Sequence, residues 1–193
     1  SKIKIRGSFE QIWDGKQLTK TFTVKTPKEY RGQLHTIQYH VIDGSVTSQS
    51  THQFSSEYSN CLFDSNVHYL DLLGLDIMDF KIQSSQAVMR GIKNYWEVNI
   101  VPKDDKRKEK YQFRKALMYV NSTRLLPERI GYVPLGQSYY KMIVLKGYKS
   151  IGDHWIPTVI DVSYVEPDKT KRGAFTLSFK GLKVLGSKWY HFF

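Results

Sequence analysis

The chain has few of the residues that carry covalent or metal chemistry. Cys61 is its single cysteine, so an intrachain disulfide is excluded. The six histidines form neither an HExxH motif nor a Cys/His spacing typical of zinc sites. A glycine-rich phosphate loop and a GxSxG nucleophile motif are also missing from the sequence. We therefore predict that the protein is not an enzyme and that it needs neither a metal nor a cofactor.

Acidic residues and long apolar runs are scarce as well. The 18 Asp and Glu residues are outnumbered by 29 Lys and Arg residues, which leaves a formal net charge of +11. This excess is compatible with a polyanionic partner, whether nucleic acid, an anionic membrane surface or an acidic protein. Because the basic residues are spread along the chain, a solvated surface is the alternative that their distribution favours. The apolar runs are shorter than the roughly 18 residues that a membrane-spanning helix needs. Ser1 lies inside a strand-like pattern, so we expect a signal peptide and an N-terminal helix outside this sequence.

The pattern that is abundant is that of antiparallel strands. Apolar side chains occupy alternate positions from Ile3 to Trp13 and again from Leu18 to Val24, on either side of the turn sequence Asp14-Gly15. This alternation predicts a hairpin with one covered face and one wet face. We expect Phe9, Trp13, Phe22 and Val24 on the covered face, and Lys2, Lys4, Thr21 and Thr23 on the wet face.

Further alternating runs predict most of the remaining strands. They lie at 35–41, 46–54, 96–100, 111–119, 129–133, 139–148, 156–164 and 175–179. The charged tract 103–110 is interpreted as a hairpin loop. An antiparallel meander with one apolar face must cover that face. We predict a mainly β (α+β) fold and a single domain over 1–193, in which a curved antiparallel sheet, or half-open β-barrel, is partly covered by a short helical lid.

The lid is predicted where the sequence loses its two-residue period, from Val67 to Phe80. Tyr69, Leu72 and Leu73 have helical spacing in this segment. Its apolar residues have no other obvious face to cover, so we expect an apolar cavity between the lid and the sheet. Asp79, near the end of the segment, is interpreted as part of a solvated helix face rather than as a catalytic acid.

Several short motifs follow one another in an order typical of one family. The C-terminal half contains YVNSTRLLPERIGYV, then KMIVLKGYKSIGDHWIPTVIDVSYVEPDKTKRGAFTLSF, and finally GSKWYHFF. The tract KIRGSFEQIWDGKQLTKTFTVKTPKEYR fits the family's first hairpin and the proline after it, and GIKNYWEVNIVPK fits a strand that ends in Pro-Lys. Along nearly its whole length the chain resembles the LolA-like outer-membrane lipoprotein-sorting proteins, with LLPERI and DHWIPT as the best matches.

This resemblance implies a half-open β-barrel with an apolar cavity, and transfer without catalysis. Such a protein shields lipid or lipoprotein acyl chains in the periplasm of a Gram-negative bacterium, free or anchored to a membrane. Its implied partners are an inner-membrane transporter or an outer-membrane acceptor. In the best-known carriers an arginine precedes the first proline and holds the lid. Here Thr26 takes that place, and Arg31 is the nearest substitute.

The predicted cavity is lined by residues from the hairpin, the lid and the later strands. They are Phe9, Trp13, Phe22, Tyr69, Leu72, Leu73, Trp96, Tyr132 and Trp155. For each of them a plain core role is the alternative, because a cavity-lining ring and a core ring look alike in sequence. The alternative function is a basic OB-like domain that binds single-stranded nucleic acid by aromatic stacking. RNA-recognition motifs, zinc fingers and a basic recognition helix are missing, so nucleic acid is not the expected partner.

Overall fold

The computed structural model describes residues 6–14, 16–32, 34–40, 46–50, 61–62, 67–68, 79–151 and 154–181. The chain divides into two compact units, Ser1–Gly74 and Leu75–Ser187, to which short C-terminal segments are added. All of the strand pairs among the described residues are antiparallel, as the alternating runs predict. The single domain over 1–193 stays a prediction.

The first unit contains a four-stranded sheet with the strand order β1-β2-β3-β4. Its elements are β1 (Arg6–Trp13), β2 (Gln17–Thr26), the 3-10 helix η1 (Lys28–Tyr30), β3 (Leu34–His40) and β4 (Val46–Ser50). A short ribbon, β5 (Cys61–Leu62) and β6 (Val67–His68), belongs to the same unit.

The first two strands form the antiparallel hairpin that the alternation predicts. Phe9 lies opposite Phe22, and Trp13 lies opposite Leu18. Asp14 closes the turn, because its Oδ1 atom accepts hydrogen bonds from the second and third following backbone N–H groups at 2.8 and 2.7 Å. This side-chain turn stabilises the change of direction that the sequence Asp14-Gly15 indicates.

The two faces of this hairpin differ less in burial than predicted. Val24 is buried, as expected, and Phe22 is half-buried. Thr21 and Thr23, which we expected on a wet face, are half-buried too, because β3 pairs with β2 and the Thr36 hydroxyl lies 3.4 Å from that of Thr21. Lys2, Lys4 and the side chains of Phe9 and Trp13 lie outside the part of the chain that the structure describes.

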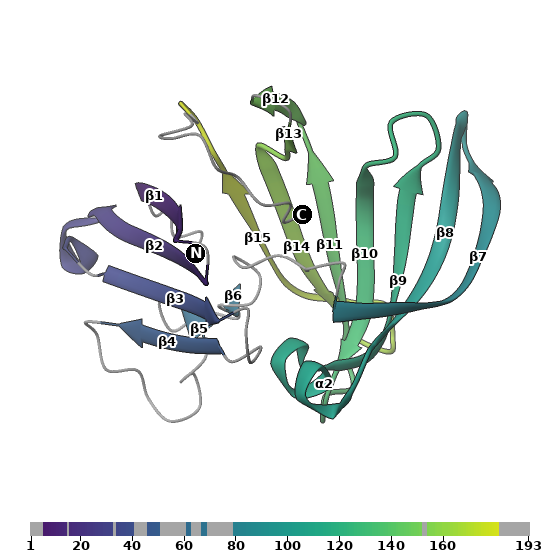
Figure 1. The fold of residues 1–193 in the computed structure, drawn as a ribbon, viewed down its shortest axis with the longest axis horizontal. Coiled ribbons are helices and arrows are strands. Elements are labelled where there is room, and N and C mark those ends of the chain that lie inside the picture. Colours follow the sequence, from purple (N-terminus) through teal and green to yellow (C-terminus); the bar gives the residue numbers. More distant parts are fainter. Residues whose placement is uncertain are drawn as a thin grey trace. The chain divides into compact units, whose positions relative to one another are not determined.

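The second unit is built on a seven-stranded sheet with the order β15-β14-β11-β10-β9-β8-β7. Its strands are β7 (Phe80–Arg90), β8 (Lys93–Pro102), β9 (Phe113–Asn121), β10 (Pro127–Pro134), β11 (Tyr140–Lys146), β14 (Val159–Val165) and β15 (Lys171–Ser178). A small ribbon, β12 (Lys149–Ile151) and β13 (His154–Ile156), emerges between β11 and β14. The sheet curves without closing on itself, which confirms the predicted half-open architecture (Figure 1).

The core lies on one face of this sheet, which we call the inner face. Ile100, Ala116, Tyr132, Lys141 and Tyr164 are successive cross-strand partners, and all five are buried. Because side chains alternate along a strand, the residues two positions away share this face. Residues one position away, such as Gly131, lie on the opposite face, which we call the outer face.

The charged tract that we predicted as a hairpin loop is instead a helix, α2 (Asp105–Tyr111). Asp104 caps it by accepting a hydrogen bond from the backbone N–H of Arg107 at 2.9 Å. The tract consists largely of straight-chain residues, which favour helix, and Gln112 ends it in a left-handed conformation. Tyr111, predicted in the next strand, is therefore the last residue of α2.

Strand β7 was not predicted from the sequence. It forms an edge of the seven-stranded sheet, and nearly all of its residues after Phe80 are exposed. A strand that is wet on both faces has no reason to alternate apolar and polar side chains, so the two-residue period is missing from its sequence.

The helical lid predicted from Val67 to Phe80 is wrong at both of its ends. Val67–His68 forms β6, and Phe80 begins β7. Residues 69–78 lie outside the described part of the chain. Asp79 is buried rather than part of a solvated helix face. Among the described residues, no helix is long and apolar enough to cross a membrane, and no cluster of three metal-ligating side chains is found.

Candidate functional site

The centre of the inner face is a cluster of buried aromatic rings. Phe113 is fully buried, with its ring centroid 5.7 Å from that of Phe80 and 4.6 Å from that of Tyr132. Tyr139 and Tyr164 form an edge-to-face pair at 5.4 Å. Each such pair contributes about 0.5–1.5 kcal/mol beyond the burial of its area. This part of the inner face is therefore a packed core.

One cation is buried within this aromatic cluster. Lys141 is 4% exposed, and its Nζ lies 5.8 Å from the ring centroid of Tyr132 and 5.5 Å from that of Tyr164. The faces of aromatic rings attract cations, most strongly where water is excluded. Lys141 thus places a basic side chain among the aromatic rings of the inner face.

The buried carboxylate of Asp79 links helix α2 to the start of β7. Asp79 accepts a hydrogen bond from Arg107 Nε at 2.8 Å and another from the Tyr111 hydroxyl at 2.7 Å. The carbonyl of Asp79 also accepts a bond from the N–H of Lys103, which leads into the helix. The side chain of Asp79 is only 5% exposed, so these partners offset the cost of removing a charge from water.

Toward the opposite end of the strands, the inner face becomes less buried. Trp96 is 43% exposed, and its cross-strand partner Val120 is half-buried. Ile160 pairs with the buried Leu145 on one side and with Leu177 on the other. Both Ile160 and Leu177 are half-buried as well. We call this partly exposed region the apolar shelf, and it consists of Trp96, Val98, Val120, Ile160, Phe175 and Leu177.

Tyr148 stands beside the apolar shelf and packs against the core cluster. Its hydroxyl donates a hydrogen bond to the carbonyl of Pro127. Burial raises the pKa of Tyr148 strongly, so its hydroxyl stays protonated and neutral at physiological pH. The shelf is therefore a set of apolar side chains bordered by a neutral tyrosine, which suits an apolar ligand.

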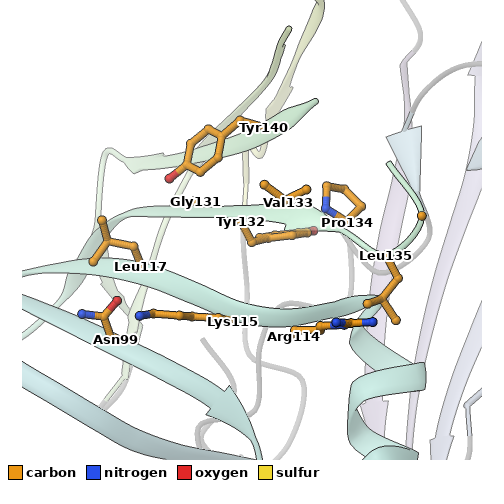
Figure 2. Close-up of a pocket in the computed structure, with 11 residues that line it drawn as sticks. Asn99, Arg114, Lys115, Leu117, Gly131, Tyr132, Val133, Pro134, Leu135 and Tyr140 are labelled. Atoms are coloured by element: carbon orange, nitrogen blue, oxygen red, sulfur yellow. The ribbon is translucent and has the colours of Figure 1, made fainter. Parts of the chain in front are cut away.

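The outer face carries an open groove of about 480 Å³ over β9, β10 and the start of β11. Tyr140 lies on one side of it and Lys115 on the other, with Leu135 at one end (Figure 2). Gly131 lies in the floor of the groove, and the Tyr140 ring packs directly over it because the glycine has no side chain. A Cβ atom there would lie 1.7 Å from the Tyr140 hydroxyl oxygen. Burial raises the pKa of Tyr140, so its phenol is neutral too.

The carboxylate of Glu128, on the outer face, accepts several hydrogen bonds. Glu128 accepts bonds from Tyr95 at 2.8 Å, Asn121 at 3.0 Å and Lys93 at 3.3 Å. Desolvation pushes the pKa of Glu128 upward, but these three bonds outweigh it and hold the pKa below its ordinary value of 4.5. The bonds thus stabilise the charged form of Glu128 in the folded state.

We expect this arrangement to make the folded state sensitive to acid. A carboxylate whose pKa is lower in the folded state stabilises that state above its unfolded pKa, and the contribution is lost as the pH falls through the folded pKa. The free energy of unfolding, measured by urea titration, should therefore decrease as the pH is lowered below about 4.5. Glu128→Gln should make this decrease shallower, because it removes the carboxyl group whose pKa is lowered on folding. Equal pH profiles for wild type and Glu128→Gln would contradict the assignment.

One protein family includes this chain. A protein-family model described as "Uncharacterized protein" matches residues 46–176, about two thirds of the chain. The chain belongs to this family. A search of the curated proteins finds no match.

Solved structures share the fold along most of the chain. A domain from Vibrio parahaemolyticus, named for outer membrane lipoprotein sorting, has a TM-score of 0.59 at 13% identity. The match covers 91% of this chain and 77% of the Vibrio chain. A DUF1329 family protein from Desulfovibrio piger has a TM-score of 0.56 at 18% identity, with the same coverage. A LolA superfamily protein from Nitrosomonas europaea has a TM-score of 0.54 at 13% identity and covers 83% and 71%. The LolA-like resemblance is confirmed in the fold.

The residues predicted to line one cavity belong to several elements of the fold. Tyr132 lies in the buried core and also borders the outer groove, and Trp96 lies on the apolar shelf of the same inner face. Trp155 lies on the β12–β13 ribbon, outside the seven-stranded sheet, and is 48% exposed. Phe22 belongs to the first unit. Tyr69, Leu72 and Leu73, and the side chains of Phe9 and Trp13, lie outside the described part of the chain, so their role stays a prediction.

Other residues of the inner face were missed in the sequence. Val98 was visible, because it follows Trp96 by two positions and must share its face. Lys141 was also visible as a charge in phase with Ile143 and Leu145. Arg31, the proposed substitute for the lid arginine, forms a hydrogen bond with a residue nearby in the sequence. Its Nε donates to the carbonyl of Lys25 at 3.2 Å, at the end of β2.

Proposed function

We propose that this protein is a lipid or lipoprotein carrier that shields acyl chains on the inner face of its LolA-like sheet. The observation that carries the proposal is the apolar shelf. It presents half-buried aliphatic and aromatic side chains beside a packed aromatic core, and Trp96 is 43% exposed on it. Burying one methylene group of a lipid chain contributes about 0.8 kcal/mol, so a site for acyl chains needs apolar area and few polar contacts.

The setting of this carrier is the periplasm of a Gram-negative bacterium. The names of the Vibrio and Nitrosomonas proteins, which refer to lipoprotein sorting and to the LolA superfamily, support this proposal. The partners would then be an inner-membrane transporter that supplies the lipid or lipoprotein and an outer-membrane acceptor that takes it. Transfer of this kind breaks no covalent bond, which agrees with the proposal that the protein is not an enzyme and uses no cofactor.

A matched pair of substitutions on β15 tests the proposal. Leu177 points to the inner face, and the next residue, Ser178, points to the outer face. Leu177→Glu should weaken binding of a dansyl-labelled fatty acid at least about tenfold, because a charge in an apolar site is costly. Ser178→Glu places the same charge on the same edge strand and should leave binding unchanged. Probe fluorescence, with unlabelled fatty acid as competitor, measures both.

Two results would contradict the carrier function. One is equal probe binding by wild type and Leu177→Glu, with both folded by circular dichroism. The other is binding of a labelled single-stranded oligonucleotide, measured by fluorescence anisotropy, whose logarithm of affinity falls linearly with the logarithm of salt concentration. The second result would favour the nucleic-acid function instead.

A further inference from the structure

Three connections of the second unit reach the same end of the seven-stranded sheet (Figure 1). They are the β7–β8 turn, the β9–β10 turn and the excursion that contains the β12–β13 ribbon. This follows from the meander, since alternate connections return to the same end. We call the described residues of these connections, 89–94, 122–126, 146–151 and 154–158, the tip end.

The tip end exposes large apolar side chains. Met89 is 71% exposed, Ile92 is 100% exposed, Leu125 is 66% exposed and Trp155 is 48% exposed. Single apolar residues on a surface need no explanation, but four in neighbouring connections form a concentration that marks an interaction site. Trp155 adds an amphipathic ring of the kind found at the boundary between water and membrane.

Leu125 is also held in an unfavourable backbone conformation. Its φ of 54° lies in the left-handed region, where Asn and Gly are favoured and other residues are uncommon. An exposed leucine at this position gains no burial in the folded protein to offset that cost. A role for the side chain outside the chain itself accounts for its presence, as strained residues often do at functional sites.

The described residues of the tip end carry charge of one sign, and Asp153, in the same excursion, lies outside them. Its described residues include Arg90, Lys93, Arg124, Lys146 and Lys149, and no Asp or Glu. Three of these cations form ion pairs with carboxylates within the strands: Arg90 with Glu97, Lys93 with Glu128 and Lys146 with Asp161. The opposite end of the sheet has both signs, with Asp104, Asp105 and Glu109 around α2 and Glu166 and Asp168 in the β14–β15 turn.

We propose that the tip end docks on an anionic lipid bilayer, with Ile92 and Leu125 inserted at its surface and the cations placed against lipid phosphates. Apolar side chains surrounded by Lys and Arg are complementary to such a surface, which is apolar below a negative layer. The row of the apolar shelf that contains Trp96, Val120 and Leu177 is the row nearest to this end. Docking therefore brings the shelf close to the lipid, although it does not depend on the proposed carrier function.

Sedimentation with vesicles tests the proposal. The full chain should bind vesicles of phosphatidylcholine and phosphatidylglycerol in equal amounts, and bind vesicles of phosphatidylcholine alone much more weakly. Ile92→Ser and Leu125→Asn should each weaken binding roughly tenfold, because each removes one inserted apolar side chain. Leu125→Asn relieves the backbone conformation, so its effect cannot arise from unfolding. Arg124→Gln should weaken binding about fivefold.

Matched controls lie away from the tip end. Ile82→Ser removes a similarly exposed apolar side chain, 65% exposed on β7, and Lys106→Gln removes a cation on α2. Neither should change vesicle binding. The proposal is overturned by equal binding to both kinds of vesicle, by no binding to either, or by tip and control variants that behave alike. The fatty-acid probe separates the two proposals: Leu125→Asn should retain full probe binding, and loss of vesicle binding alone leaves the carrier function standing.

Discussion

Replacing Asp79 by alanine is expected to destabilise the second unit by about 3 kcal/mol, near the lower end of the range for breaking a buried ion pair. The carboxylate is 5% exposed, and its removal leaves Arg107 Nε and the Tyr111 hydroxyl without the oxygens they now contact at 2.8 and 2.7 Å. Arg107 is 34% exposed, so water replaces part of what it loses. Urea unfolding measured by circular dichroism gives the change in the free energy of unfolding.

The control for this prediction is an ion pair on the same helix. Lys108 and Asp105 are 2.7 Å apart, but their side chains are 36% and 88% exposed. Lys108→Ala should therefore cost about 0.5 kcal/mol or less. If Asp79→Ala and Lys108→Ala destabilise equally, the buried carboxylate does not fasten α2 to the sheet.

Gly131→Val is expected to displace the Tyr140 ring and to destabilise the protein by about 1–3 kcal/mol, the usual cost of overfilling a packed site. Gly131 does not have a positive φ, so valine is compatible with the backbone and the effect comes from contact alone. A Cβ atom would lie 1.7 Å from the hydroxyl oxygen and 2.4 Å from the Cζ atom of Tyr140. The ring must therefore leave its place over the glycine.

A double-mutant cycle isolates this contact. In a Tyr140→Ala background the space over Gly131 is vacant, so Gly131→Val should then cost much less than it does in the wild type. The coupling energy from urea unfolding should be at least about 1 kcal/mol. Additive effects of the two substitutions would mean that the valine is harmful for another reason, and that the packing of Tyr140 over Gly131 is not what excludes a side chain there.

The first hairpin illustrates how far local pattern reaches. Alternation on both sides of Asp14-Gly15 predicts the two strands and their antiparallel pairing, and the structure has both. These properties depend on neighbours within a few residues, and side-chain alternation in a strand is a local property of the backbone. The same reasoning predicts β10, β11 and β14.

Helix α2 and strand β7 show where local pattern fails. The tract around Arg107 has no apolar periodicity, because the helix is held mainly by its cap at Asp104 and by the buried Asp79, which is distant in sequence. β7 is wet on both faces, so nothing in its composition marks it as a strand. Its pairing with β8 supplies the backbone hydrogen bonds that decide its conformation.

The sequence by itself determined the class of this protein: an antiparallel, aromatic-rich sheet whose motifs follow the LolA-like order, because strand period and turn residues are written in neighbouring positions. The tertiary structure alone decided which apolar residues are buried in the core and which stay partly exposed. Tyr132 and Trp96 are alike in sequence as apolar strand residues, yet one is 7% exposed in the core and the other 43% exposed on the shelf. Burial depends on how many strands flank a residue and on what packs above it, and those neighbours come from distant parts of the chain.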